Sequence, residues 1–397
     1  MNEQTKDTTT PPVATGFAGL VKKITTKSQA GGLTTGLFTL ASSLAAVLIA
    51  LGICAILLAI TGKDPWAAYT EILKTGTKSN QLLEMMKRAT PLMLSATAVA
   101  VGFKMNLFNI GVEGQYLFAA LMASAIGTQL SLPAVLHVTV ILLLAIISGA
   151  VWASIAAILK VTRGVHEVIS TIMLNYIALS VIQWLFENWF RDNSLELNIK
   201  TKALPVSGRM PDIVKDRLGG MFIVALFVVF LYWVLVFKSR FGFRLRASGL
   251  NAGAARTAGI GANRMIVIAM LISGGIAGLV AMQNILGEVY GYGPNATPTQ
   301  LGFAGITVAL LGRHHPIGII TAALLFGFLD STSAQLQLAE IPSSIVKVIQ
   351  AVIVFTVVIV NEATIRWLNK RTSERTAARL VESGVQVSGV QVEGASA

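Results

Sequence analysis

Apolar residues in this chain gather into long runs, and short segments between the runs hold most of the charged side chains. A run of roughly 20 apolar residues can cross the ~30 Å hydrocarbon layer of a bilayer as one helix. The segment 301–312 is shorter than that, so we interpret it as a short or re-entrant helix. The pattern predicts ten transmembrane or re-entrant helical segments, over about 35–62, 88–104, 115–131, 134–159, 166–188, 220–238, 265–287, 301–312, 316–334 and 343–362.

Composition supports the same fold class. Of the 397 residues, 54% are hydrophobic and 13% are charged, and the mean hydropathy is +0.70. A soluble domain typically carries about 25% charged residues. A large soluble protein with an apolar interior is the alternative, and the length of the apolar runs argues against it. We therefore expect an all-α integral membrane protein.

The distribution of Lys and Arg predicts the orientation in the membrane. A net charge of +12 can indicate a nucleic-acid-binding protein, but here the basic residues lie mainly in short segments between apolar runs. Basic residues prefer the cytoplasmic side of a membrane protein. With both termini in the cytoplasm, the inside segments hold more Lys and Arg than the outside segments. The sequence thus favours an N-in and C-in topology and no nucleic-acid partner.

This topology divides the chain into three parts. We expect 1–34 to be a polar cytoplasmic segment, 35–365 the transmembrane domain, and 366–397 a basic and then low-complexity cytoplasmic tail. The first part contains no hydrophobic region of a signal peptide, so 35–62 is expected to act as an uncleaved anchor. The single cysteine, Cys54, lies in an apolar run and leaves no intrachain disulfide framework.

A polar stretch, NLFNIGVEGQ over 106–115, separates two of the predicted segments. Its glycines permit backbone angles that interrupt a helix. One interpretation is an ordinary cytoplasmic turn with hydrated side chains. The other is a broken segment at membrane depth that shapes a translocation path, since polar groups at that depth often mark such paths. The residues in question are Asn106, Asn109, Gly111, Glu113, Gly114 and Gln115.

Within this stretch, FNIGVEGQ resembles the signature of permease subunits of bacterial ABC importers for nucleosides and simple sugars. That group includes the ribose-type permeases, and the branched-chain amino acid permeases are its relatives. The resemblance covers roughly 40–365, and the form N-I-G-x-E-G-Q is most similar to the nucleoside-type permeases. It implies a multi-pass transporter subunit of the bacterial cell membrane that is not an enzyme and has no cofactor or metal.

The resemblance also implies partners and a substrate. The expected partners are ABC ATPase subunits, a second permease subunit that is a different chain, and an extracellular substrate-binding lipoprotein. The expected substrate is a nucleoside, with a purine nucleoside preferred. The sequence has no phosphate-binding loop G-x-x-x-x-G-K followed by Ser or Thr, so ATP is expected to bind a separate subunit.

A basic loop, 238–264, lies between two predicted spans. The Ala-rich AGAARTAG favours a short helix, which Ser248 or Asn251 would cap and Gly259 would end. By composition alone, the loop would only fix topology. However, RASGLNAGAARTAGI is similar to the cytoplasmic coupling helix of these permeases, R-x-x-G-x-N-x-x-A-A-x-x-x-G-I. The resemblance implies an ATPase-coupling site at Arg244, Arg246, Gly249, Asn251, Ala254, Ala255, Gly259 and Ile260.

Other polar residues within or near the spans complete a predicted substrate pathway. Membrane helices often use such side chains for interhelical hydrogen bonds worth about 0.6 kcal/mol each, and that structural role is the alternative for every one of them. Together they suit a polar, uncharged solute. The predicted pathway comprises Asn106, Asn109, Glu113, Gln115, Asn175, Gln283, Asn284 and Thr307. Tyr290 and Tyr292 are further candidates for contact with an aromatic base.

Two other transporter functions remain open at this point. One is an ABC permease for a simple sugar such as ribose. The other is an ion-coupled secondary transporter, for which Glu113 is the main ionisable candidate. An enzyme is not indicated: HEVIS at 166–170 has Ser170 where the zinc-protease motif needs its second histidine, and the sequence has no G-x-S-x-G motif.

Overall fold

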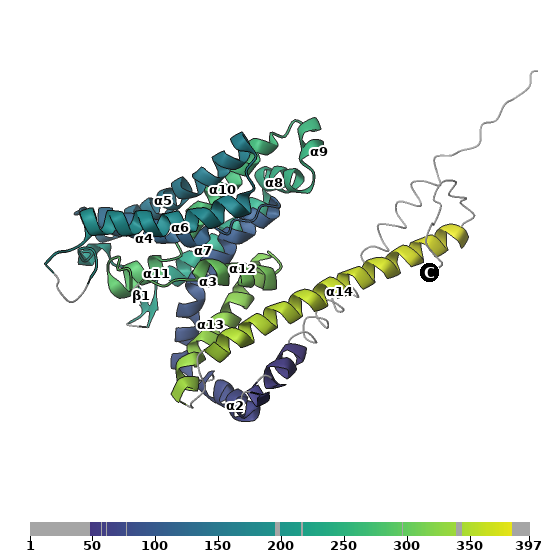
Figure 1. Ribbon diagram of the computed structural model, residues 1–397, viewed down its shortest axis with the longest axis horizontal. Helices are drawn as coiled ribbons and strands as arrows, with labels where there is room; N and C mark the ends of the chain where they lie inside the picture. Colours follow the sequence, from purple (N-terminus) through teal and green to yellow (C-terminus); the bar gives the residue numbers. More distant parts are fainter. Residues whose placement is uncertain are drawn as a thin grey trace, which may run out of the picture. The chain divides into compact units, whose positions relative to one another are not determined.

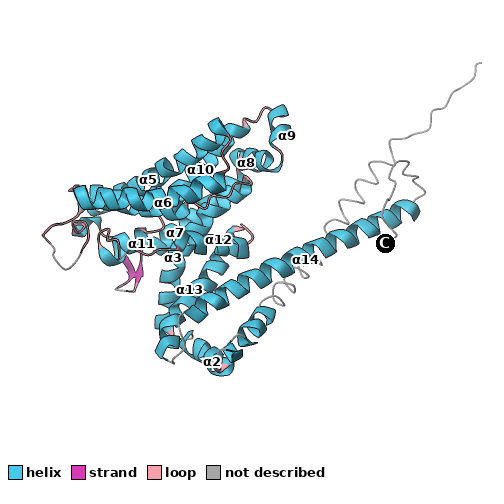
Figure 2. Cartoon of the chain, in the orientation of Figure 1, coloured by secondary structure: helices cyan, strands magenta, loops and turns pink. Residues whose placement is uncertain are grey.

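The computed structural model describes residues 48–382 except 57, 61, 77, 195–198, 216, 296 and 339–343. The described residues are mostly helical, with one antiparallel hairpin of β1 (Asp212–Val214) and β2 (Leu218–Gly219) (Figure 2). An apolar helix covers Leu48–Ile60. The labelled helices are α2 (Pro65–Gly76), α3 (Ser79–Lys104), α4 (Val112–Gly127), α5 (Ala134–Arg163), α6 (Glu167–Leu185), α7 (Met221–Trp233), α8 (Arg240–Leu250), α9 (Ala252–Thr257), α10 (Ala262–Gly278), α11 (Met282–Asn284), α12 (Leu301–Leu311), α13 (Pro316–Leu338) and α14 (Ser344–Glu382).

Three of the long apolar helices continue into a π-helical turn. These turns are η1 (Phe186–Phe190) after α6, η3 (Val234–Lys238) after α7 and η4 (Ile285–Val289) after α11, which follows α10 closely. A short 3₁₀ turn, η2, covers Val206–Gly208. Single π turns within helices are uncommon and often lie at functional sites.

The expectation of an all-α membrane protein is confirmed. Among the described residues, six helices are long and apolar enough to cross a bilayer, and Leu48–Ile60 and Leu301–Leu311 are shorter apolar helices. Each of the ten predicted segments coincides with a helix where the structure describes it. The number of spans and the N-in and C-in topology remain predictions. The six long helices are Ala134–Arg163, Glu167–Phe190, Met221–Lys238, Ala262–Val289, Pro316–Ser333 and Ile345–Thr364.

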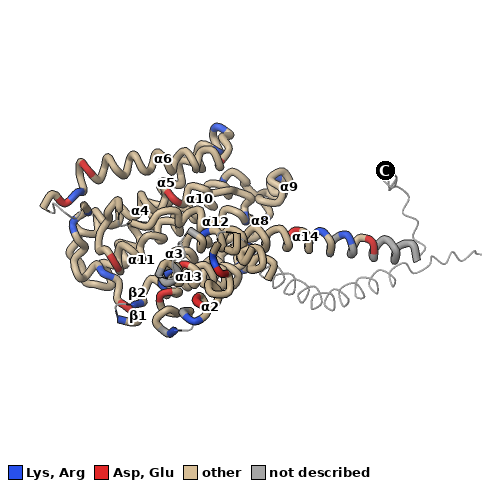
Figure 3. Tube along the Cα trace, turned by 60° about the horizontal axis from the view of Figure 1, so that its bottom comes forward, with Lys and Arg blue, Asp and Glu red and all other residues tan. Residues whose placement is uncertain are grey.

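The charge pattern of these helices fits a lipid environment. Figure 3 shows α5 and α6 almost free of charged residues except near their ends. In α5 the only charged residues are Lys160 and Arg163, in its last turn. Large apolar side chains such as Ile147 and Tyr176 are exposed, as expected for helices whose outer faces contact acyl chains.

The chain forms two compact units. One unit is 55–354, and the other combines the residues up to 54 with those from 355 onward. The predicted polar segment 1–34 lies outside the described residues, and so does the tail beyond 382. Residues 366–382 continue helix α14. The polar stretch 106–115 and the basic loop 238–264 both lie within the unit 55–354.

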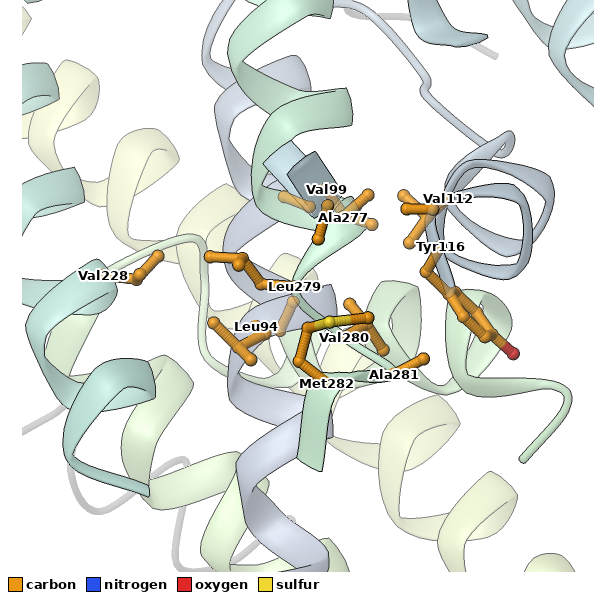
Figure 4. Packing of buried hydrophobic residues seen from close by; sticks show 14 of the residues in the cluster. Leu94, Val99, Val112, Tyr116, Val228, Ala277, Leu279, Val280, Ala281 and Met282 are labelled. Atoms are coloured by element: carbon orange, nitrogen blue, oxygen red, sulfur yellow. The ribbon is translucent and has the colours of Figure 1, made fainter. Parts of the chain in front are cut away.

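Within the unit 55–354, α4, α5, α6 and α10 run side by side (Figure 1). Helix α3 packs against α7, α10, α12 and α13. Leu94 and Val99 of α3 belong to one buried cluster with Ala277, Leu279 and Met282 of the α10–α11 segment (Figure 4). Helices α3 and α10 are therefore in contact at the centre of this unit.

Small residues allow α5 and α10 to approach each other closely. A Cβ atom on Gly149 of α5 would collide with the carbonyl oxygen of Gly274, and one on Gly278 would collide with that of Ala145. Gly274 and Gly278 form a G-x-x-x-G pair, which brings backbones together in membranes, where packing rather than hydrophobic burial drives helix association.

We predict that Gly149→Ala destabilises the protein by about 1–3 kcal/mol, because the added methyl group must push α5 and α10 apart. Thermal unfolding in detergent would measure the effect as a lower midpoint. Gly261→Ala is the matched control, because a Cβ there lies 3.7 Å from its nearest neighbour, the Cβ atom of Arg264. Equal midpoints for the two variants would contradict the close helix contact.

Candidate functional site

The FNIGVEGQ stretch forms a turn and the start of α4, and its two buried amides bond to each other. Asn109 and Gln115 exchange two side-chain hydrogen bonds of 3.0 Å each. Asn109 also donates to the Ser273 hydroxyl of α10 at 2.8 Å, and Ser273 donates to the Ala98 carbonyl of α3 at 2.6 Å. This network connects α3, α4 and α10 through buried polar groups.

Asn175 of α6 completes the network from the other side. Its Oδ1 atom accepts a hydrogen bond from the Gly114 N–H, and its Nδ2 atom donates to the Ile110 carbonyl, both at 2.9 Å. Asn109, Gln115 and Asn175 are buried, so the hydrated-turn interpretation does not hold for them. Their hydrogen bonds are made to protein groups, which assigns these three amides to supporting the broken segment.

Glu113 connects the start of α4 to the start of α12. Its Oε1 atom accepts from the Gln300 N–H at 2.6 Å, and its Oε2 atom accepts from the Gly302 N–H at 2.9 Å. The Tyr116 hydroxyl lies 2.8 Å from Oε1. Helix N-termini carry unpaired N–H groups and favour negative charge. The partly buried carboxylate therefore caps α12.

Two predicted pathway residues lie elsewhere. Asn106 is exposed, has a left-handed φ of 57°, and lies beside α8, where it lines a cavity of about 450 Å³. The other lining residues of that cavity are Phe103, Lys104, Arg246, Gly249 and Leu250. Thr307 donates to the Ala304 carbonyl of its own helix at 2.7 Å. The structure thus does not place Asn106 and Thr307 together at one site.

Gln283 and Asn284 line a separate cavity of about 250 Å³ between α3, the α11 region, α12 and α13. Their side chains are only 5% and 7% exposed, and Gln283 Oε1 and Asn284 Oδ1 have no hydrogen-bond partner among the described residues. A buried acceptor without a partner costs about 1–3 kcal/mol. The complete lining is Glu84, Lys87, Arg88, Pro91, Leu92, Val280, Ala281, Gln283, Asn284, Glu288, Pro298, Leu301 and Asp330.

Ion pairs at this cavity were not predicted from the sequence. Lys87 of α3 lies 3.2 Å from the Glu288 carboxylate of η4, and Arg88 lies 2.8 Å from the Glu84 carboxylate one turn away. A signal for them exists, because positions 84, 87 and 88 share one face of a helix. The segment predicted from apolar residues begins at 88, so it does not include Glu84 and Lys87.

A second cavity of about 240 Å³ adjoins the first, since Lys87, Gln283 and Glu288 line both. Tyr290 also lines the second cavity, and its ring centroid lies 4.1 Å from the Arg209 guanidinium. The remaining lining residues are Asp212, Arg217, Gly219 and Gly287. Of the two tyrosines suggested by the sequence, Tyr290 therefore lies at a cavity.

Tyr292, in contrast, belongs to the packed interior. It is 5% exposed, and its N–H lies 2.9 Å from the Ser124 hydroxyl and 3.1 Å from the Thr201 hydroxyl. Its ring meets that of Phe186 edge to face. These contacts assign Tyr292 a structural position.

The basic loop contains two helices rather than one. The helix predicted over AGAARTAG is α9, and Asn251 caps it by accepting a hydrogen bond from the Ala254 N–H at 3.0 Å. Gly259, with a left-handed φ of 76°, follows its end as predicted. Ser248 lies inside the preceding helix α8 and does not act as the cap.

The predicted coupling residues are divided between surface and support. Four of them are exposed: Arg244, Asn251, Ala254 and Gly259. Ile260 is partly buried. Ala255 is buried. Arg246 donates to the Val236 carbonyl, and a Cβ on Gly249 would press against the backbone of Met105. Of the exposed residues, Ala254 lies on α9, Asn251 caps it and Gly259 follows its end, whereas Arg244 lies on α8.

Helix α10 separates the coupling loop from the cavities. It begins at Ala262, at the end of the basic loop, and the segment that follows its end at Gly278 carries Gln283 and Asn284. Seventeen helical residues span about 25 Å. Figure 1 shows α8 and α9 near one end of α10, and α11, whose residues line the cavity of about 250 Å³, near the other.

The turn between α12 and α13 contains a histidine with an altered pKa. His314 is partly buried, and its ring centroid lies 4.5 Å from that of Phe103. Burial, together with the positive charge of Lys104, lowers the pKa of His314 to about 4. The unfolded chain binds this proton near pH 6.5, so folding stability is lost as the pH falls through the window from 6.5 to 4.

These features define a polytopic membrane permease with a broken polar segment and a short helix between two spans. Residues 81–358, more than half of the chain, match the family described as branched-chain amino acid transport system / permease component. The chain therefore belongs to this permease family, as its sequence resemblance predicted.

Several curated relatives are similar over most of their length. The chain is 36% identical over 277 residues to the guanosine ABC transporter permease protein NupP of Bacillus subtilis, covering 69% of this chain and 80% of the relative. It is 32% identical to the nucleoside ABC transporter permease protein NupB of Lactococcus lactis, covering 77% and 86%. The glucose ABC transporter permease protein TsgB13 of Haloferax volcanii is 30% identical, with 78% and 84% covered. These relatives are transporter subunits and not enzymes.

We predict that Asn175→Leu lowers stability by about 1–3 kcal/mol, because it leaves the Gly114 N–H and the Ile110 carbonyl without partners. Thermal unfolding in detergent would detect the change. Ser180→Ala on the same helix is the control, since the exposed Ser180 hydroxyl bonds only weakly, at 3.4 Å, to the Tyr176 carbonyl. If Asn175→Leu is as stable as Ser180→Ala, the result would contradict a supporting role for Asn175.

We also predict that acidification from pH 7.5 to 5 lowers the unfolding midpoint more in the unmodified protein than in His314→Asn. Asn does not titrate and tolerates the left-handed φ of 54° at this position. The difference between the two pH profiles isolates His314 from the other titrating groups. Parallel profiles would show that His314 does not contribute to acid sensitivity.

Proposed function

We propose that this chain is the permease subunit of an ATP-driven ABC importer that moves nucleosides, with purine nucleosides preferred, across the bacterial cell membrane. The observation that carries the proposal is its 36% and 32% identity to permeases named for guanosine and nucleosides. The two adjoining polar cavities in a helical membrane domain, one with Tyr290 in its wall, agree with a solute that has an aromatic base.

The arrangement supports a mechanism in which α10 connects two sites. The cavities lie at the end that the predicted topology places outside, where a receptor lipoprotein would deliver the solute. The α8–α9 helices lie at the other end, where ATPase subunits would bind. Closure of the ATPases would displace α9, and α10 would transmit the displacement through its contact with α3 to the cavity walls. A second, different permease chain completes the proposed importer.

A simple sugar is the second candidate substrate, because one relative is named for glucose. The ion-coupled alternative is less well supported by the geometry. Its main candidate, Glu113, uses both carboxylate oxygens to cap α12. A carboxylate that carries ions through a membrane must exchange its partners during transport, and these hydrogen bonds would have to break in each cycle.

Uptake measurements test the proposal directly. Cells that carry this chain with its candidate partner subunits would receive labelled guanosine, adenosine, ribose or glucose. We expect guanosine and adenosine uptake that disappears when the phosphate-loop lysine of the ATPase is replaced. Sugar uptake alone would favour the second candidate, and uptake that instead collapses with the ion gradient would contradict an ABC importer.

We further predict that replacing 252–257 by a flexible Gly-Ser segment of equal length abolishes uptake and the stimulation of ATPase activity by solute. The substitution removes α9 and its exposed surface while leaving the cavity residues unchanged. Solute binding to the purified transporter should persist. Gly261→Ala, in the same loop but outside α9, is the control. Normal uptake by the segment variant would contradict coupling through α9.

A further inference from the structure

The two adjoining cavities share one wall, which contains both a hydrogen-bonding amide and an ion pair. Gln283 lines both cavities, and so do Lys87 and Glu288, whose charged groups lie 3.2 Å apart. Lys87 comes from α3 and Glu288 from η4, so the ion pair joins two separate elements at the junction of the cavities. A solute that moves from one cavity to the other must pass this wall.

The cations of the 250 Å³ cavity are already paired with carboxylates. Glu288 neutralises Lys87, and Glu84 neutralises Arg88. Asp330 adds a further carboxyl group to the lining, where it accepts a hydrogen bond from Gln350 at 2.8 Å. A phosphate group entering here would have to displace a carboxylate from its cation and approach other acidic groups, which is costly at reduced dielectric. An uncharged solute meets no such barrier.

In contrast, two side-chain acceptors on residues that line this cavity have no partner among the described residues. Gln283 Oε1 and Asn284 Oδ1 belong to side chains that are more than nine-tenths buried, and neither atom has a partner among the described residues. A site built to bond a substrate O–H or N–H strongly disfavours analogues without that donor, because its own buried group is then left unpaired. Nucleosides offer such donors on both the ribose and the base.

We propose that Gln283 and Asn284 are specificity-determining residues that accept hydrogen bonds from an uncharged nucleoside, and that the Lys87–Glu288 ion pair excludes its phosphorylated forms. This inference rests on the proposed function and specifies which solutes the site distinguishes. The amides select for donors, and the paired charges select against phosphate. Neutral nucleosides thus pass where nucleotides do not.

Kinetics of guanosine uptake test the amide half of the proposal. The unmodified chain, assembled with its partner subunits in proteoliposomes, would be compared with Gln283→Leu and Asn284→Leu. Each variant should raise the KM for guanosine about tenfold, the effect of roughly 1.4 kcal/mol. Gln283→Glu keeps the acceptor oxygens and should retain more affinity. Thr139→Val is the control, because the exposed Thr139 hydroxyl bonds only to its own helix, at the Val135 carbonyl.

Competition by guanosine monophosphate tests whether the ion pair excludes phosphate. The expected result is a gain of inhibition by the nucleotide. The unmodified transporter should be inhibited by this nucleotide only weakly, at high concentrations. Glu288→Gln releases Lys87 from its partner, so the nucleotide should then inhibit guanosine uptake at a concentration about tenfold lower than in the unmodified protein. Glu84→Gln, which releases Arg88 at the same cavity, should act in the same direction.

The outcomes separate this inference from the proposed function. ATP-dependent guanosine uptake with an unchanged KM in both leucine variants would overturn the role of the amides and leave the importer intact. Unchanged nucleotide sensitivity in Glu288→Gln would overturn charge exclusion. A complete lack of ATP-dependent uptake by the unmodified assembly would instead contradict the importer itself. If a leucine variant fails to fold, Gln283→Glu and the nucleotide measurement still decide.

Discussion

The reciprocal hydrogen bonds between Asn109 and Gln115 are the interaction on which this membrane domain depends. A buried backbone that leaves the helical conformation needs hydrogen-bond partners from the protein itself. The amide pair, Ser273 and Asn175 supply them, and in doing so they connect α3, α4, α6 and α10. Glu113 extends the same support to α12. Polarity at this position therefore organises the domain.

The buried amides of this domain fall into two groups, one that supports the helices and one that is proposed to recognise the solute. Amides whose nitrogen and oxygen both have protein partners connect the helices. Gln283 and Asn284, in contrast, line a cavity and have side-chain oxygens without a partner among the described residues. The two groups have the same chemistry and similar burial. Only the count of hydrogen bonds distinguishes them, and it assigns one group to the architecture of the permease and the other to its solute.

Sequence reasoning predicted the elements better than the roles of their residues. Apolar runs located the helices because length and hydropathy suffice for that, and the Asn251 cap and Gly259 end followed from local propensities. The supporting role of Asn109 depends on Ser273, 164 positions away, which no local pattern reveals. Glu84 and Lys87, on the charged face of α3, lie outside the predicted span. Charged residues at the edge of an apolar run indicate the end of a span, so the sequence alone does not assign them to the helix.

The π-helical turn η4 adds a mechanical property to the cavity wall. A π turn contains one more residue than an α turn, so converting one into the other changes the helical phase of everything beyond it by roughly 100°. Glu288 lies within η4, and Tyr290, just beyond it, has a left-handed φ of 55°. A change of a single residue in helical register would thus turn the Glu288 carboxylate away from Lys87 without unwinding the helix. Such a change of phase would alter the cavity wall without a hinge in a loop.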